Sequence, residues 1–194
     1  MDAPYLCDEI EGQARGAAFV GEGDCYRVAL WRHTGVANPS RDWAVFVGLN
    51  PSTADATTDD PTIRRCVGFA SRWSARIMVM LNLYAFRATD PKDLHAWLVR
   101  RTASELRLES DANYDAIRGV LDGTNSFCCG DAPVILAWGA HGAKLGGRCH
   151  LVEQLVWGYT QAQCLGTTKG GEPRHPLYLP YGTPYATFER KGVR

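Results

Sequence analysis

The chain has 194 residues, of which 45% are hydrophobic and 22% charged, and its formal net charge is zero. This length and composition suit one globular domain and exclude a disordered chain. No apolar run is long enough to span a membrane, and the acidic amino terminus has no apolar core of a secretory signal. We expect a single cytoplasmic domain over residues 1–194, with residues 1–25 at its periphery.

Short apolar runs separated by polar breaks predict the strands. A run bounded by turn residues, with no alternation, is typical of a strand that is buried on both faces. The expected strands, in chain order, are Tyr26–Trp31, Trp43–Leu49, Ile77–Leu81, Val134–Trp138 and Gln163–Leu165.

Helical patterns lie between these runs. Asp60-Pro61 is an N-cap followed by a first-turn proline, and it predicts a helix that ends near Trp73. Further helices are expected at about Ser104–Leu121 and Lys144–Trp157, with long loops at 50–60 and 82–93. The alternation predicts a three-layer α/β/α sandwich around a central, mainly parallel four-stranded sheet.

Polar residues follow the ends of these strands, where ligands bind in such folds. Asn50 and Asn82 each end an apolar strand, and an amide can orient water or read the edge of a base. Each can equally be a turn residue that caps its own loop. Asp55 is a candidate general base, and His175 can donate to a ligand oxygen or be an exposed loop histidine. Tyr84 and Phe86 can stack on a base or cover the sheet.

The strand ends, taken together, resemble motifs of the uracil-DNA glycosylase superfamily. The run Val47–Ser52 is similar to the G-[IL]-N-P-G motif of mismatch-specific enzymes, and Met80–Leu83 is similar to the L-L-N strand end of uracil-DNA glycosylases. Leu136–Gly139 and His175–Leu179 resemble the L-L-W-G segment and the H-P-[SA] loop. More closely, the runs GLNPSTADA, NLYAFRATDP and HPLYLP resemble a bacterial and phage family known as a domain of unknown function.

The glycosylase resemblance implies a role for each matching residue. Asn50 positions the water that attacks C1′, Asn82 reads the extruded base, and His175 stabilises charge on the departing base. The implied partner is single- or double-stranded DNA, and no obligate protein partner is evident. The base-binding residues are Gly48, Leu49, Asn82, Tyr84 and Phe86. The DNA-binding residues are Ser52, Arg64, Arg65, Arg87, Arg174 and Tyr178.

The sequence also departs from that pattern. It lacks the Asp-Pro-Tyr motif of the most active uracil enzymes, so it has neither their carboxylate nor their tyrosine gate against a 5-substituent. The hypothesis is a monofunctional DNA glycosylase that removes uracil or a 5-modified pyrimidine in repair or in defence against phages. The alternatives are a DNA or modified-base binding protein without activity and a hydrolase of free nucleosides or nucleotides.

Two further features bear on partners and cofactors. Residues 64–101 and 140–194 carry net charges of +6 and +4, so a basic face exists if the fold joins them. The seven cysteines are odd in number and contain no C-x-x-C, and the adjacent pair Cys128 and Cys129 cannot close one tetrahedral site. We expect no disulfide framework, metal or cofactor.

Overall fold

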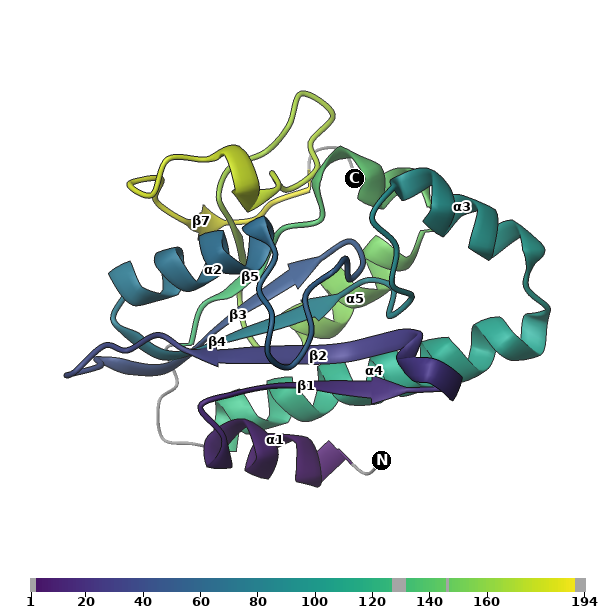
Figure 1. Cartoon of the computed structure of the whole chain (residues 1–194). Helices are drawn as coiled ribbons and strands as arrows, with labels where there is room; N and C mark the ends of the chain where they lie inside the picture. The colour runs from purple at the N-terminus through teal and green to yellow at the C-terminus, as the bar shows by residue number, and fades with distance from the viewer. Residues whose placement is uncertain (1–2, 127–131, 146, 191–194) are drawn as a thin grey trace.

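The computed structural model describes residues 3–126, 132–145 and 147–190 (Figure 1). Its strands form one sheet with the order β1-β2-β4-β3-β5-β6-β7. The strands are β1 (Arg15–Val20), β2 (Tyr26–His33), β3 (Arg41–Gly48), β4 (Ala75–Asn82), β5 (Val134–Leu136), β6 (Ala162–Cys164) and β7 (Ala186–Thr187). The α-helices are α1 (Ala3–Gly12), α2 (Pro61–Arg72), α3 (Pro91–Arg100), α4 (Ala103–Ser126) and α5 (Arg148–Trp157). The 3-10 helices are η1 (Glu22–Asp24), η2 (Gly139–Lys144) and η3 (Pro176–Tyr178).

The sheet is mixed and larger than the sequence indicates. β3 pairs in parallel with β4 and β5, and β5 pairs in parallel with β6. β2 pairs antiparallel with both β1 and β4, and β7 pairs antiparallel with β6. The predicted α/β class is confirmed, but the sheet has seven strands where four were expected. The additional strands are the edge strands β1 and β7 and the interior strand β2, which contains the expected run Tyr26–Trp31 and joins the sheet antiparallel to β4.

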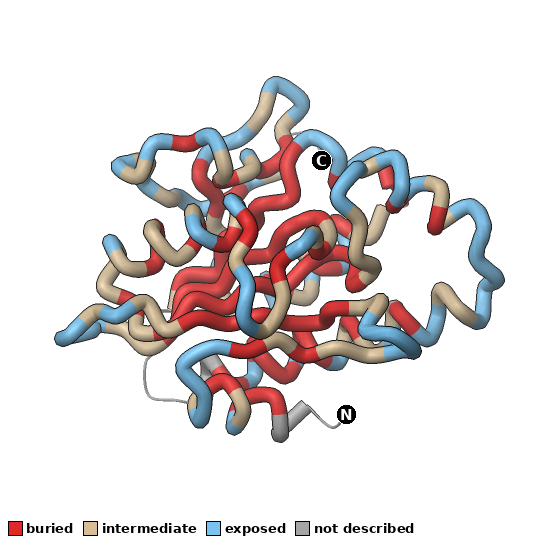
Figure 2. Tube along the Cα trace, viewed as in Figure 1, coloured by how far each residue is buried: buried red, intermediate tan, exposed pale blue. Residues whose placement is uncertain are grey.

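Side chains of the central strands alternate between two apolar layers (Figure 2). Val45 and Val47 of β3 face α1, α4 and α5, whereas Ala44 and Phe46 face α2. All four are fully buried, which confirms that the continuous apolar run is a strand covered on both faces. Helices therefore lie on both sides of the sheet, with α2 on one face and α1 and α4 on the other (Figure 1).

The amino-terminal segment, which the sequence places at the periphery, supplies an edge strand and a covering helix. β1 pairs with β2, and Ile10 of α1 is fully buried against the helical layer that contains α4. No helix within the described parts of the chain is long and apolar enough to cross a membrane.

The helix boundaries agree with the sequence where a cap is present. Asp60 accepts a hydrogen bond from Ile63 N at 2.9 Å, which confirms the predicted N-cap of α2. The predicted helix 144–157 is instead divided into η2 and α5, because Gly147 adopts a left-handed conformation between them. Helix α3 lies within and beyond the expected loop 82–93, and Asp90-Pro91 begins it in the same way as Asp60-Pro61 begins α2.

A buried polar cluster holds the backbone that follows β4. Glu109 of α4 is fully buried, accepts from Ala85 N at 2.6 Å, and pairs with Arg148 of α5 at 2.7 Å. Asn113 of α4 donates from Nδ2 to the carbonyls of Asn82 at 3.0 Å and Leu83 at 3.2 Å. The position of the end of β4 therefore depends on α4 and α5 as well as on the sheet.

We expect Glu109→Gln to lower the free energy of unfolding by about 3–5 kcal/mol, because it leaves the Arg148 guanidinium buried without its carboxylate. Urea denaturation measures this change. The matched control is Asp111→Asn, also on α4, which removes an exposed pair with Arg107 and costs about 0.5 kcal/mol or less. Equal costs for the two variants would contradict a structural role for the buried pair.

Candidate functional site

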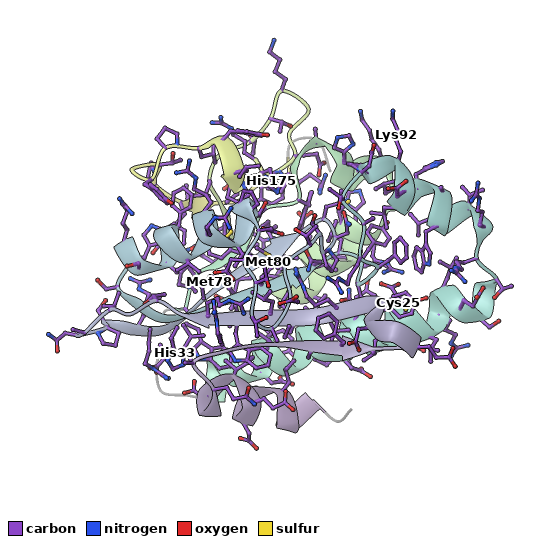
Figure 3. All side chains as sticks on the ribbon, viewed as in Figure 1. Cys25, His33, Met78, Met80, Lys92 and His175 are labelled. Carbon is purple, nitrogen blue, oxygen red and sulfur yellow. The ribbon has the colours of Figure 1, made fainter. Side chains whose placement is uncertain are left out.

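A cleft of about 580 Å³ lies at the carboxyl ends of β3, β4 and β5. Its floor is formed by strand residues, and its walls come from the loop before α2, the start of α2, η2 and η3. The volume suits a ligand of nucleotide size. Figure 3 labels His175 and Met80, and both line this cleft. The predicted site residues that line it are Gly48, Leu49, Asn50, Ser52, Asn82, His175 and Tyr178.

Asn82 is a buried polar side chain of the floor. It is 2% exposed, and its amide nitrogen Nδ2 has no hydrogen-bond partner. Gly48 lies opposite it in the parallel register, and a Cβ atom on Gly48 would lie 2.9 Å from Asn82 Oδ1. Glycine at position 48 therefore leaves the room that this amide needs. A buried amide donor without a partner costs free energy, so it is poised for a ligand acceptor.

Asn50 is held by its own loop and by the loop after β4. Its Nδ2 donates to Ala88 O at 2.7 Å and to Pro51 O at 2.9 Å. Carbonyl oxygens only accept hydrogen bonds, so the amide nitrogen must face them and Oδ1 is the atom left for the cleft. Asn50 can thus accept a hydrogen bond from a water or ligand, but it has no free donor.

His175 begins η3 and offers a donor to the cleft. Its Nδ1 accepts a hydrogen bond from Leu177 N at 3.3 Å. Burial lowers the pKa of His175 below its usual value, and the nearby Asp60 carboxylate opposes this effect only in part. In the neutral ring the proton therefore lies on Nε2. A neutral Nε2–H donor can stabilise an oxygen on which negative charge develops without first giving up its proton.

Two aspartates of the loop before α2, Asp55 and Asp60, differ in their position relative to the cleft. Asp55 Oδ1 accepts from Thr57 N at 2.8 Å and Thr58 N at 2.7 Å, and these bonds lower its pKa to about 2. Asp55 does not line the cleft, so the structure does not bring this candidate general base to the other candidates. Among the described lining residues, the one carboxylate belongs to Asp60, which also caps α2.

Tyr84 and Phe86 do not face the cleft. Tyr84 is buried below the guanidinium of Arg148, 4.4 Å from its ring centroid, and its hydroxyl bonds to Leu145 O. Phe86 stacks on Trp97 with ring centroids 4.7 Å apart and lines a separate hollow beside the cleft. Both rings therefore pack against other side chains of the protein, and neither is placed to stack on a base in the cleft.

The cleft opens beside a surface of arginine and tyrosine side chains. Tyr178 is 87% exposed at its rim. Arg65 donates to Leu177 O at 3.2 Å, and the guanidinium groups of Arg65 and Arg72 each lie 4.2 Å from the centroid of the Tyr181 ring. Helix α2 of the first basic segment therefore packs against the 174–181 stretch of the second.

The remaining predicted DNA contacts surround this rim without lining the cleft. Arg64 is exposed on α2 and donates to Asp59 O, and Arg174 is exposed directly before His175. Arg87 lies farther from η3, with its guanidinium 5.4 Å from the centroid of the Phe19 ring, in the hollow that contains Phe86.

Sequence reasoning missed Arg27 as a residue of the cleft. It lies on β2, is 2% exposed, and lines the floor. The signal was a charged residue within the strand run YRVALW, because charged side chains are almost never buried unless they are paired or functional. Trp138 also lines the cleft, and its indole nitrogen donates to Glu172 at 2.7 Å.

The described residues offer no cluster of metal ligands, and their cysteines are unpaired. Within the described ranges, no three His, Cys, Asp or Glu side chains lie close enough to hold a metal ion. Five cysteines are free thiols: Cys7, Cys25, Cys66, Cys149 and Cys164. Cys128 and Cys129 lie outside the described residues.

Comparison with known proteins gives one family. The sequence model of a family described as "Protein of unknown function (DUF1643)" matches residues 27–177. No curated protein and no solved structure gives a significant match. The matched range begins at Arg27 and ends at Leu177, so it contains most of the cleft.

The lowered pKa of His175 predicts how stability depends on pH. The folded state binds this proton less readily than the unfolded state, so the stabilisation is complete above about pH 6.5 and is lost as the pH falls below that value. We expect wild type to lose free energy of unfolding relative to His175→Gln between pH 8 and pH 5. Urea denaturation at both pH values measures the difference, and a constant difference would contradict the lowered pKa.

Proposed function

The chain belongs to this family of unknown function, DUF1643, and we propose that it is a monofunctional DNA glycosylase that acts on uracil or a 5-modified pyrimidine. The observation that carries the proposal is the unpartnered, buried Nδ2 of Asn82 in a cleft that also contains the Asn50 amide and His175. These groups match the amide and imidazole positions of the glycosylase motifs that the sequence resembles.

Asn82 and His175 complement a pyrimidine. An amide presents one donor and one acceptor side by side, so Asn82 can pair with the N3 and C4 edge of the base. The Nε2–H of a neutral His175 can donate to O2 of the same ring. Orienting the base in this way directs its N1, and hence the sugar, toward the mouth of the cleft.

The proposed reaction is hydrolysis of the bond between C1′ and N1. The bond breaks with its electron pair moving to the base, where the negative charge is shared between N1 and O2. His175 Nε2–H stabilises this charge, and Asn50 Oδ1 accepts a hydrogen bond from the water that attacks C1′. The water oxygen ends on the sugar, one water proton ends on the departing base, and an abasic site remains.

The fold and the rim are consistent with this proposal. Strands β4, β3, β5 and β6 pair in parallel at the centre of the sheet, as in an extended form of the four-stranded glycosylase sheet. An exposed tyrosine at the rim can stack on a base, and the arginines of α2 can contact phosphates. A reader of modified DNA without catalysis is the second candidate, because Asp55 and Asp60, two aspartates of the loop that follows Asn50, both accept structural hydrogen bonds.

Cleavage of labelled oligonucleotides tests the activity. Each single- or double-stranded substrate carries one uracil, thymine, 5-hydroxymethyluracil, 5-hydroxymethylcytosine or glucosylated 5-hydroxymethylcytosine, and hot alkali reveals abasic sites. We expect cleavage at one of these bases, and a loss of at least about 100-fold in rate for His175→Ala and Asn50→Ala, which remove groups aimed at the transition state.

The control is Arg107→Gln, a change of an exposed side chain on α4, and thermal melting shows whether each variant folds. Salt-dependent DNA binding without any abasic product would favour the reader. Full activity in both folded variants would contradict the assigned roles.

The rim predicts a specific salt dependence. If Arg64 contacts a phosphate, binding of Arg64→Gln releases about one counterion fewer from the DNA. The slope of the logarithm of the binding constant against the logarithm of the salt concentration then falls in magnitude by about 1. Fluorescence anisotropy with an unmodified oligonucleotide at several salt concentrations measures the slope. The slope of Arg107→Gln is expected to equal that of wild type, and an unchanged slope for Arg64→Gln would remove Arg64 from the interface.

A further inference from the structure

Two buried arginines lie on β2, and their surroundings differ. Arg32 is 3% exposed and is saturated with acceptors. Its Nε pairs with the Asp59 carboxylate at 2.7 Å, and its two terminal nitrogens donate to several backbone carbonyls, the closest at 2.6 Å and 2.7 Å. The charge of Arg32 is therefore compensated by the protein itself.

Arg27 is buried to the same extent, but its charge is not compensated in this way. Its terminal nitrogen donates to Ala54 O at 2.8 Å, and its Nε is buried with no hydrogen-bond partner. Among the described residues, no carboxylate lies within 4.0 Å of its guanidinium. Asp60 is near enough to favour the charged form, but its carboxylate caps α2.

The charge of Arg27 persists at neutral pH. Burial lowers its pKa to about 10, which is still well above 7. A buried cation without a partner is costly, and protein interiors normally supply one, as they do for Arg32. Asp60 and Asp55 act on Arg27 only without a direct ion pair, and Arg27 lines the cleft, so a bound ligand can supply the paired anion that the protein does not.

The position of Arg27 indicates which part of a ligand it meets. β2 lies next to β4 on the side away from β3, and Arg27 N donates to Ala85 O, just beyond Asn82. His175 lies against Gly139, which follows β5 on the other side of β3, so the order across the floor is His175, Asn82 and Arg27. A pyrimidine with O2 at His175 and its N3 and C4 edge at Asn82 places the substituent at C5 on the Arg27 side.

We propose that the cleft takes a pyrimidine with an acidic substituent at C5, a carboxylate, and that Arg27 is the counter-ion of this group. The proposal rests on the base orientation given under the proposed function, and it identifies the class of base. A guanidinium suits it because its fork of donors matches the two oxygens of a carboxylate.

Binding of free bases tests this specificity without requiring catalysis. Calorimetry at pH 7.5 compares 5-carboxyuracil with 5-carbamoyluracil, which has nearly the same shape and no charge. It also compares 6-carboxyuracil, which places the same charge elsewhere on the ring. We expect wild type to bind 5-carboxyuracil at least about 10-fold more tightly than either compound, and Arg27→Gln to reduce this preference to less than about 3-fold. The control Arg107→Gln is expected to keep the full preference.

Several results would overturn the proposal. In the wild type, these results are that 5-carboxyuracil binds no more tightly than 5-carbamoyluracil, that it binds no more tightly than 6-carboxyuracil, or that none of the bases binds. In folded Arg27→Gln, the contradicting result is that the preference for 5-carboxyuracil persists. If Arg27→Gln does not fold, the three-ligand comparison in wild type still decides. A preference for 5-carboxyuracil without cleavage of any oligonucleotide, including ones that carry 5-carboxyuracil or 5-carboxycytosine, would keep the anion site and overturn the glycosylase. Cleavage of an oligonucleotide without a preference for 5-carboxyuracil would support the glycosylase and overturn the anion site.

Discussion

The backbone at the end of β4 fixes the geometry of the cleft, and side chains of two helices hold it in place. Asn113 binds the carbonyls of Asn82 and Leu83, while Glu109 binds Ala85 N and the Arg148 guanidinium. These bonds come from the face of the sheet opposite α2, so they leave the Asn82 amide free on the other side. The same segment supplies the carbonyl of Ala85, which anchors the backbone of Arg27. One buried polar cluster therefore positions both an amide and a cation in the cleft.

Burial acts on His175 and Arg27 in the same direction but with different outcomes. It lowers both pKa values, because a less polar environment disfavours the charged form of each side chain. The pKa of histidine is ordinarily near 6.5, so lowering it favours the form that already predominates at pH 7, the neutral ring, whereas Arg27 at about 10 keeps its charge. The cleft thus combines a neutral donor with a fixed positive charge. Asp60 lies near both groups and moderates both shifts.

The sequence predicted those parts of the fold that depend on local pattern. The central strands follow from apolar runs, and Asp60-Pro61 correctly begins α2. The site was less predictable, because side-chain direction beyond a strand end depends on tertiary contacts. The sequence left open whether Tyr84 and Phe86 stack on a base or cover the sheet, and both rings pack away from the cleft because the chain has already left β4 there. Asp55 and Asp60 share one loop, and only the folded turn shows that Asp60 lines the cleft. The place of Arg27 in the cleft depends on the pairing of β2 with β4, and a pattern within one stretch of sequence cannot show which strands pair.

A fixed positive charge in the cleft bears on the chemistry that Asn50 can support. An amide cannot take a proton from water as a carboxylate can, so the proposed hydrolysis would depend more on how well the base leaves. In the proposed reaction the departing base gains negative charge, and a charged C5 substituent would oppose this gain unless a buried cation neutralised it. With an acidic C5 substituent paired to Arg27, the substituent does not repel the charge that develops on N1 and O2. In the proposed reaction Arg27 therefore recognises the substituent and removes this repulsion, while His175 Nε2–H supplies the help for the departure of the base.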